Sequence, residues 1–196
     1  NCGSKKLCSM SLVPSTCSFL DIPCIPCNAS SIVIGENKKI SNLIAITMDL
    51  NVPQDVYSPQ EEAIFRPLNY GSSFGITKGK KSSIKKDELY QEFIPGYDIT
   101  FPFMYNPLIN ELDFLPGVLY LPYSKDPNWF FGEKEKSGAK TFENYPIYYL
   151  SKNAKEKLKS FAEVFPIETY GRIDIRLKTK EDKLSSLSFF VHKNKR

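Results

Sequence analysis

The residues best suited to chemistry are five cysteines, all in the first 27 of the 196 residues: Cys2, Cys8, Cys17, Cys24 and Cys27. Thiolates bind zinc, perform redox reactions or form disulfides, and their spacing separates these roles. Cys24 and Cys27 have the spacing of half a zinc knuckle, but no second half follows and the other spacings are irregular. A thioredoxin-like redox pair needs a helix directly after it, whereas residues 32–34 predict a strand. The spacing and context therefore favour neither zinc nor a redox pair.

The cysteine count is odd, and a leftover cysteine in an oxidising compartment needs a separate function. Residues 2–6, Cys-Gly-Ser-Lys-Lys, resemble the start of a mature bacterial lipoprotein, in which a cysteine accepts the lipid and a polar tether follows. Asn1 departs from that family, where the cysteine comes first. The resemblance implies that Cys2 is a lipid anchor. The remaining disulfide candidates then form an even set with three possible pairings: Cys8, Cys17, Cys24 and Cys27. The alternative is five free buried thiols in an intracellular protein.

Other catalytic constellations are weak or missing. A triad would have to use His192, the single histidine, which we expect on the solvent side of a terminal strand. Neither GxGxxG nor GxxxxGK[ST] occurs, and residues 76–82 have the composition of a phosphate loop without its spacing. Glu111 and Asp113 could serve as the carboxylate pair of a glycan hydrolase, although surface charge is the more common interpretation. We expect no catalytic residue, no cofactor and no metal.

Aromatic side chains are the remaining candidates for binding. Trp129 and Phe130 stand beside a glycine and a charged loop, and Tyr148 lies in a later aromatic stretch. An exposed aromatic platform suits a glycan or a protein partner. We therefore predict Trp129, Phe130 and Tyr148 as binding residues.

The elements that must position these residues are mostly strands. Aromatic residues make up 13% of the chain, and the mean hydropathy is −0.31. Strands are predicted at residues 32–34, 40–50, 118–121 and 145–150, followed by a C-terminal hairpin whose first strand is residues 171–177. In that strand, alternation predicts that Arg172, Asp174 and Arg176 face water. Residues 61–66 could form one helical turn, and apolar spacing predicts one good helix at residues 153–165.

The predicted fold is mainly β (α+β), an antiparallel β-sandwich or curved sheet with one packed helix near residues 153–165. Residues 1–30 are predicted to be a cysteine-rich N-terminal arm or tether without regular structure, and residues 31–196 a single β-rich globular domain. The net charge of +4 is too small and too dispersed for dedicated nucleic-acid binding, and no apolar run would span a bilayer.

The functional hypothesis is an exported, lipid-anchored, non-enzymatic binding or structural domain. It would lie outside the cytoplasm, in the periplasm or on the outer surface, held at the membrane by its lipid. Its partner would be a protein or an envelope component. The alternatives are a carboxylate-dependent hydrolase acting on glycans and a structural subunit of a larger assembly.

Overall fold

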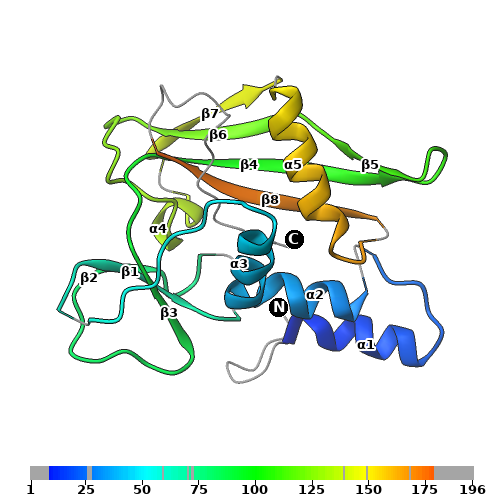
Figure 1. Cartoon of the computed structure of the whole chain (residues 1–196), viewed down its shortest axis with the longest axis horizontal. Coiled ribbons are helices and arrows are strands. Elements are labelled where there is room, and N and C mark those ends of the chain that lie inside the picture. The colour runs from blue at the N-terminus through cyan, green and yellow to red at the C-terminus, as the bar shows by residue number, and fades with distance from the viewer. Residues whose placement is uncertain are drawn as a thin grey trace.

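The computed structural model describes residues 9–25, 28–58, 60–69, 71, 73–138, 140–148, 150–167 and 169–178. Its described part contains two antiparallel sheets and several helices (Figure 1). The predicted mainly-β class with a packed helix is therefore confirmed. No described helix is long and apolar enough to cross a bilayer.

The larger sheet is built around its longest strand, β4 (Tyr97–Asn106). Strand β8 (Tyr170–Leu177) pairs along one side of β4, while β5 (Glu111–Phe114) and β6 (Gly117–Pro122) share the other side. Strand β7 (Phe142–Ile147) pairs with β6. The central pair β4–β8 therefore determines which residues each face of the sheet presents.

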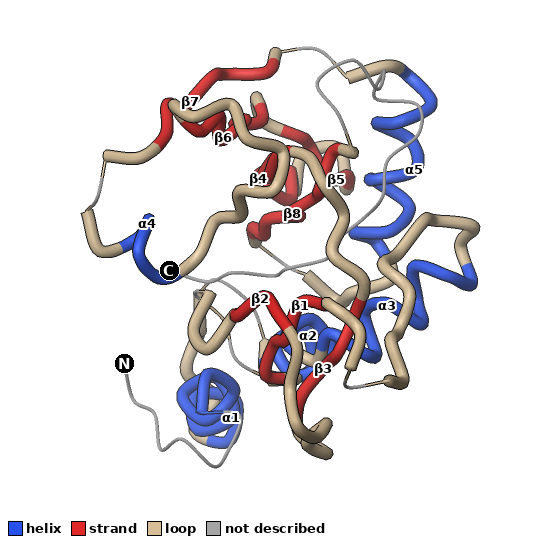
Figure 2. The backbone as a smooth tube through the Cα atoms, turned by 90° about the vertical axis from the view of Figure 1, so that its left-hand side faces the viewer, coloured by secondary structure: helices blue, strands red, loops and turns tan. Residues whose placement is uncertain are grey.

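One face of the β4–β8 pair forms the main hydrophobic core. Ile99, Phe101 and Ile173 are buried against α5 (Lys152–Glu163), whose Leu158 and Phe161 are also fully buried. Figure 2 shows α5 on one side of the larger sheet and the short helix α4 (Glu133–Lys136) on the other. The predicted helix at residues 153–165 is confirmed as α5, and Ser151 caps it by accepting a hydrogen bond from Ala154 N at 3.2 Å.

The smaller sheet has the order β2–β1–β3, comprising β1 (Ala63–Pro67), β2 (Thr77–Gly79) and β3 (Glu88–Gln91). Its own small core contains Ala63, Phe65 and Tyr90, and the two rings stack with centroids 4.3 Å apart. The helical turn predicted at residues 61–66 is wrong, because those residues lead into β1.

Four helical segments come from residues predicted to be irregular or extended. A 3₁₀ turn (Ser9–Ser11) and α1 (Leu12–Phe19) lie within the predicted irregular arm. The strands predicted at residues 32–34 and 40–50 are wrong, since these residues form α2 (Ala29–Glu36) and α3 (Lys38–Thr47). The division into an arm and a body stays a prediction.

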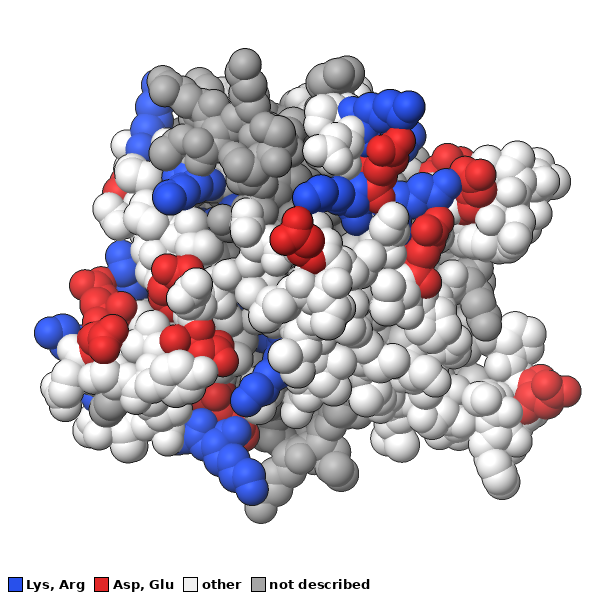
Figure 3. All heavy atoms as spheres, viewed as in Figure 1, with Lys and Arg blue, Asp and Glu red and all other residues white. Residues whose placement is uncertain are grey.

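Helices α2 and α3 begin at asparagine caps, and α3 buries polar residues while exposing apolar ones, so the sequence did not predict either helix. Asn28 accepts a hydrogen bond from Ser31 N at 2.9 Å and Asn37 one from Ile40 N at 3.1 Å, so each side chain starts a helix. Helix α3 buries Lys38, Ser41 and Asn42 and exposes Ile40, Leu43 and Ile46. The surface over α2 and α3 in Figure 3 is accordingly largely uncharged. A helix with polar residues inside does not show the usual apolar stripe.

The predicted disulfides gain no support from the described cysteines. Cys17 in α1 and Cys24 after it are half-buried and are not joined to each other. Cys2, Cys8 and Cys27 lie outside the described residues, as do His192 and the second strand of the predicted hairpin. The lipid anchor on Cys2 is therefore untested. No group of three or more potential ligands for a metal ion occurs within the described ranges.

Candidate functional site

The candidate site begins with the polar face of the β4–β8 pair. The register places Asp98 opposite Arg176 and Thr100 opposite Asp174. These β8 residues were predicted to face water, which is wrong. Arg176 is only 2% exposed, and Arg172 and Asp174 are half-buried. The alternation was correct, but this face is covered by other parts of the chain.

Arg172, Asp174 and Thr100 form a compact hydrogen-bonded group. Thr100 Oγ1 donates to Asp174 Oδ1 at 2.6 Å, and Arg172 lies 2.9 Å from the same carboxylate oxygen. Burial raises the pKa of Asp174, while the charge of Arg172 and the hydrogen bonds from Thr100 and Arg172 oppose that rise. The carboxylate of Asp174 is therefore paired with Arg172 and Thr100 within the sheet.

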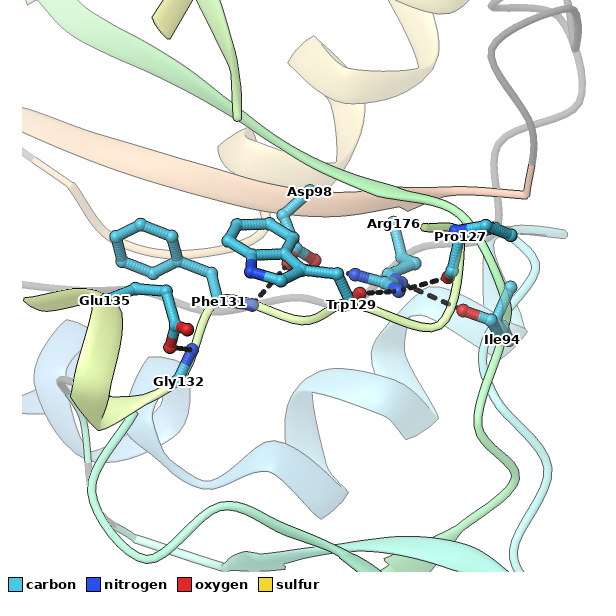
Figure 4. Close-up of polar contacts among 8 residues, drawn as sticks. All are labelled: Ile94, Asp98, Pro127, Trp129, Phe131, Gly132, Glu135 and Arg176. Atoms are coloured by element: carbon cyan, nitrogen blue, oxygen red, sulfur yellow. Dashed lines mark hydrogen bonds and ion pairs between the residues drawn. The ribbon is translucent and has the colours of Figure 1, made fainter. Parts of the chain in front are cut away.

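Arg176 reaches further along the same face (Figure 4). Its Nη1 lies 2.9 Å from Asp98 Oδ2, which also accepts a hydrogen bond from Phe131 N at 2.9 Å. Its other donors bond backbone carbonyls on both sides of this ion pair. A guanidinium has five donors in a planar fork, so it can hold several segments at once.

The candidate site also includes two buried cations that lie outside the larger sheet. Lys38 starts α3 and Arg66 lies in β1, and their exposed fractions are 2% and 3%. Lys38 Nζ donates to Leu68 O at 3.4 Å, and Arg66 Nη2 donates to Gln91 Oε1 at 2.8 Å. Lys38 is thus held beside the residue that follows β1.

The two cations act on each other electrostatically. Burial and, to a smaller extent, the charge of Arg66 lower the pKa of Lys38 from 10.5 to about 7, while the charge of Glu36 opposes the shift. Burial also lowers the pKa of Arg66, to about 9, against the attraction of Asp98. Two buried cations whose charges interact are suited to an anionic ligand, which would repay part of their burial cost.

A glycine- and serine-rich turn follows β1 in the sequence. Gly75 and Ser73 both have positive φ, at 68° and 56°, and Ser73 is buried. Phe74 N donates to Gly71 O at 3.2 Å, which closes the turn. Ile76 N donates to Ser73 O at 3.4 Å, so both of these N–H groups are bonded within the turn. The sequence identified this stretch only as a loop, because it fits no known phosphate motif.

The predicted aromatic platform exists only in part. Trp129 and Phe131 pack with Phe142 at the start of β7, with ring centroids 5.8 and 5.0 Å apart respectively. Phe130 packs instead against Phe93, 6.4 Å away. Tyr148 lies beyond the opposite end of β7 and is 81% exposed, so it does not join the others. Their role in binding stays a prediction.

The predicted carboxylate pair takes part in other interactions. Glu111 Oε2 lies 2.6 Å from Lys159 Nζ of α5, and Asp113 accepts a hydrogen bond from Asn106 Nδ2 at 3.3 Å. The contacts of Glu111 and Asp113 are those of ordinary charged residues at a sheet edge.

Comparison with solved structures identifies the fold. No known protein family and no curated protein matches the sequence. The VanG D-Ala:D-Ser ligase from Enterococcus faecalis matches with a TM-score of 0.67 at 18% identity, over 92% of this chain and 58% of that one. The D-alanine–D-alanine ligase from Bacillus anthracis complexed with ATP matches with a TM-score of 0.60 at 18% identity, over 91% and 63%. This chain shares the ligase fold.

A putative ATP-grasp superfamily protein from Archaeoglobus fulgidus also matches this chain, with a TM-score of 0.59 at 11% identity over 92% of this chain and 52% of that one. The chain therefore spans between 52% and 63% of the three structures named here.

The ligase fold corrects the functional hypothesis drawn from the sequence. The predictions of a non-enzymatic binding or structural domain and of a glycan hydrolase are wrong, because the similar structures are ligases and an ATP-grasp protein. The predicted extracytoplasmic location is contradicted by the same likeness, whereas lipidation of Cys2 stays untested. The predicted protein or envelope partner, and the prediction that no nucleic acid is bound, stay untested.

Proposed function

We propose that this chain binds the phosphates of ATP at Lys38 and Arg66, as the nucleotide-binding part of an ATP-dependent ligase. The observation that carries the proposal is the pair of buried cations, Lys38 and Arg66, in a chain that shares the fold of the ligases named above. One similar ligase is complexed with ATP, which makes a nucleotide the natural anion. The joining of two small amino acids is the reaction that the names of the similar ligases suggest.

The chemistry of the donors fits a polyphosphate. Arg66 offers a planar guanidinium, which bonds phosphate oxygens in pairs, and Lys38 offers a compact ammonium. A phosphate between them would favour the charged form of Lys38 and offset the repulsion that now lowers its pKa.

Titration of the protein with ATP in a calorimeter tests this function. Lys38→Met and Arg66→Met should each weaken binding about tenfold or more, since a hydrogen bond to a charged group contributes about 1.5–3 kcal/mol. Lys152→Met is the matched control, because Lys152 is an exposed α5 lysine with a side chain 91% exposed. Circular dichroism should show that each variant is folded. Absence of ATP binding by the unaltered protein, or equal affinity in all variants, would reject the proposal.

A further inference from the structure

A cavity of about 350 Å³ lies between the β4–β5 hairpin and the C-terminal end of α5, which runs beside β5 (Figure 1). Part of its lining is apolar: Leu112, Phe165 and Ile167 line it, and each is at most 8% exposed. Two carboxylates, those of Glu111 and Glu163, line it as well. Small-molecule sites typically measure about 300–1,000 Å³ and combine apolar walls with a few polar groups. The cavity therefore has the size and composition of a small-molecule site.

The wall of the cavity that follows α5 is held in place from two sides. Ile167 N donates to Phe165 O at 2.7 Å, which forms a tight turn around Pro166. Pro166 O accepts hydrogen bonds from Asn28 Nδ2 at 3.1 Å and from Ser31 Oγ, at the start of α2. Because this wall is already ordered, a ligand would not have to order it on binding.

Both charged residues that line the cavity are acidic. Glu111 Oε2 lies 2.6 Å from Lys159 Nζ, whereas Glu163 Oε1 lies 4.0 Å from the same ammonium. Lys159 is therefore paired mainly with Glu111, and the charge of Glu163 is only weakly compensated by this lysine. Two carboxylates beside one ammonium leave a net negative charge, which attracts a cation and repels an anion.

Glu163 also occupies an unfavourable place for a carboxylate. It is the last residue of α5, and the final carbonyl groups of a helix carry a partial negative charge. These carbonyls repel a carboxylate and favour a cation. The side chain of Glu163 is 49% exposed, so burial does not oppose its charged form. A cation in the cavity would be attracted by Glu163 and by the end of α5 together.

We propose that this cavity binds a small molecule in which a primary ammonium group is attached to an apolar group. Glu163 binds the ammonium, and Leu112, Phe165 and Ile167 contact the apolar group. The proposal does not rest on the proposed function, because Lys38 and Arg66 are not among the residues that line the cavity.

Phenethylammonium is the probe that tests the site, since it joins a primary ammonium to an apolar ring. In a titration of the whole chain followed by heteronuclear NMR, it should shift the backbone amide signals of Leu112, Phe165 and Ile167 until they saturate. Phenylpropanoate has the same ring and spacer but a negative charge. It should bind at least about tenfold more weakly, because the carboxylates repel it.

Two matched variants test the role of Glu163. Glu163→Gln should weaken the binding of phenethylammonium about threefold to fivefold, the range expected for a half-exposed ion pair. The variant should unfold at a temperature no lower than the unaltered protein, because it removes an unfavourable charge from the end of α5. Glu156→Gln is the control: Glu156 also lies on α5, 3.9 Å from the lysine four residues before it, but it does not line the cavity. Glu156→Gln should bind phenethylammonium as the unaltered protein does.

Three results would overturn the proposal. These are the absence of saturable shifts at the amides of Leu112, Phe165 and Ile167, equal affinity for phenethylammonium and phenylpropanoate, and unchanged affinity in Glu163→Gln. Since the titrations contain no nucleotide, their outcome is independent of whether the chain binds ATP.

Discussion

Lys38 illustrates how burial turns an ordinary residue type into a candidate ligand-binding group. Most lysines on this chain lie at the surface, whereas Lys38 is 2% exposed at the start of α3. Its neighbour in the folded chain, Arg66, is 28 residues away in sequence and shares its positive charge. A purely structural role would favour a neutral side chain here, because desolvating an ammonium is costly. This cost is what an anionic ligand would offset.

The stability of the ligand-free protein should depend on pH through Lys38. Because its pKa falls from 10.5 in the unfolded chain to about 7 in the folded one, the unfolded chain binds more protons between these values. Stability therefore rises with pH in this window, by at most about 1.4 kcal/mol per pH unit. Urea unfolding at pH 7 and pH 9 should show a smaller rise for Lys38→Met than for the unaltered protein. Equal rises would contradict the shifted pKa.

Gly96 lies directly before β4, in the segment that joins the smaller sheet to the larger one. It has a φ of 151°, and a Cβ added to it would lie 1.5 Å from Leu177 O at the end of β8. The sequence correctly predicted a turn at Pro95–Gly96. It did not predict that β8 passes directly beside the turn, because that contact joins residues about 80 positions apart.

Gly96→Ala should destabilise the protein by more than about 3 kcal/mol or prevent folding, because both the backbone angle and the clash oppose a side chain. Gly138→Ala is the matched control: its φ of 100° is also positive, but nothing lies within 4 Å of an added Cβ. That change should cost about 1–2 kcal/mol. Urea denaturation curves measure both. A cost for Gly96→Ala no larger than that of Gly138→Ala would show that the β8 contact is unimportant.

At the scale of the whole molecule, the two sheets have very unequal cores. The core of the larger sheet contains 15 buried hydrophobic residues, including those of α5, whereas the small-sheet core contains three. Buried apolar area is the main source of local stability. The smaller sheet therefore depends more on polar contacts, such as Arg66 with Gln91 and Lys78 with Asn128 in the loop of residues 123–132. A sheet held in this way can adjust its position when a ligand binds.

Native-state hydrogen exchange should reflect this inequality. Amides of β4 and β8 should exchange at least about tenfold more slowly than those of β1 and β3, because opening the larger sheet exposes far more apolar surface. Mass spectrometry of peptic fragments covering the two sheets resolves them. Equal protection throughout would mean that both sheets open as one unit, and would contradict a small sheet that moves separately.

The sequence by itself determined the features that depend on local periodicity. The apolar spacing of residues 153–165 predicted α5, and the alternation of residues 171–177 predicted β8 and the correct face for each of its side chains. The aromatic and β-branched composition predicted the mainly-β class. These features can be predicted because side-chain directions repeat every 3.6 residues in a helix and every two in a strand, whatever surrounds the element.

Only the tertiary structure decided what covers each face. It brought Arg176 into hydrogen bonds with the loop of residues 123–132 and showed that two predicted strands are α2 and α3. It also brought Lys38 to Arg66, although no local motif marks either residue. Burial, and the pKa shifts that follow from it, arise from the packing of segments distant in sequence. Residues that come together from distant segments have no fixed spacing in the sequence, so no motif marks them. The absence of motifs therefore led to the wrong prediction of a non-enzymatic domain.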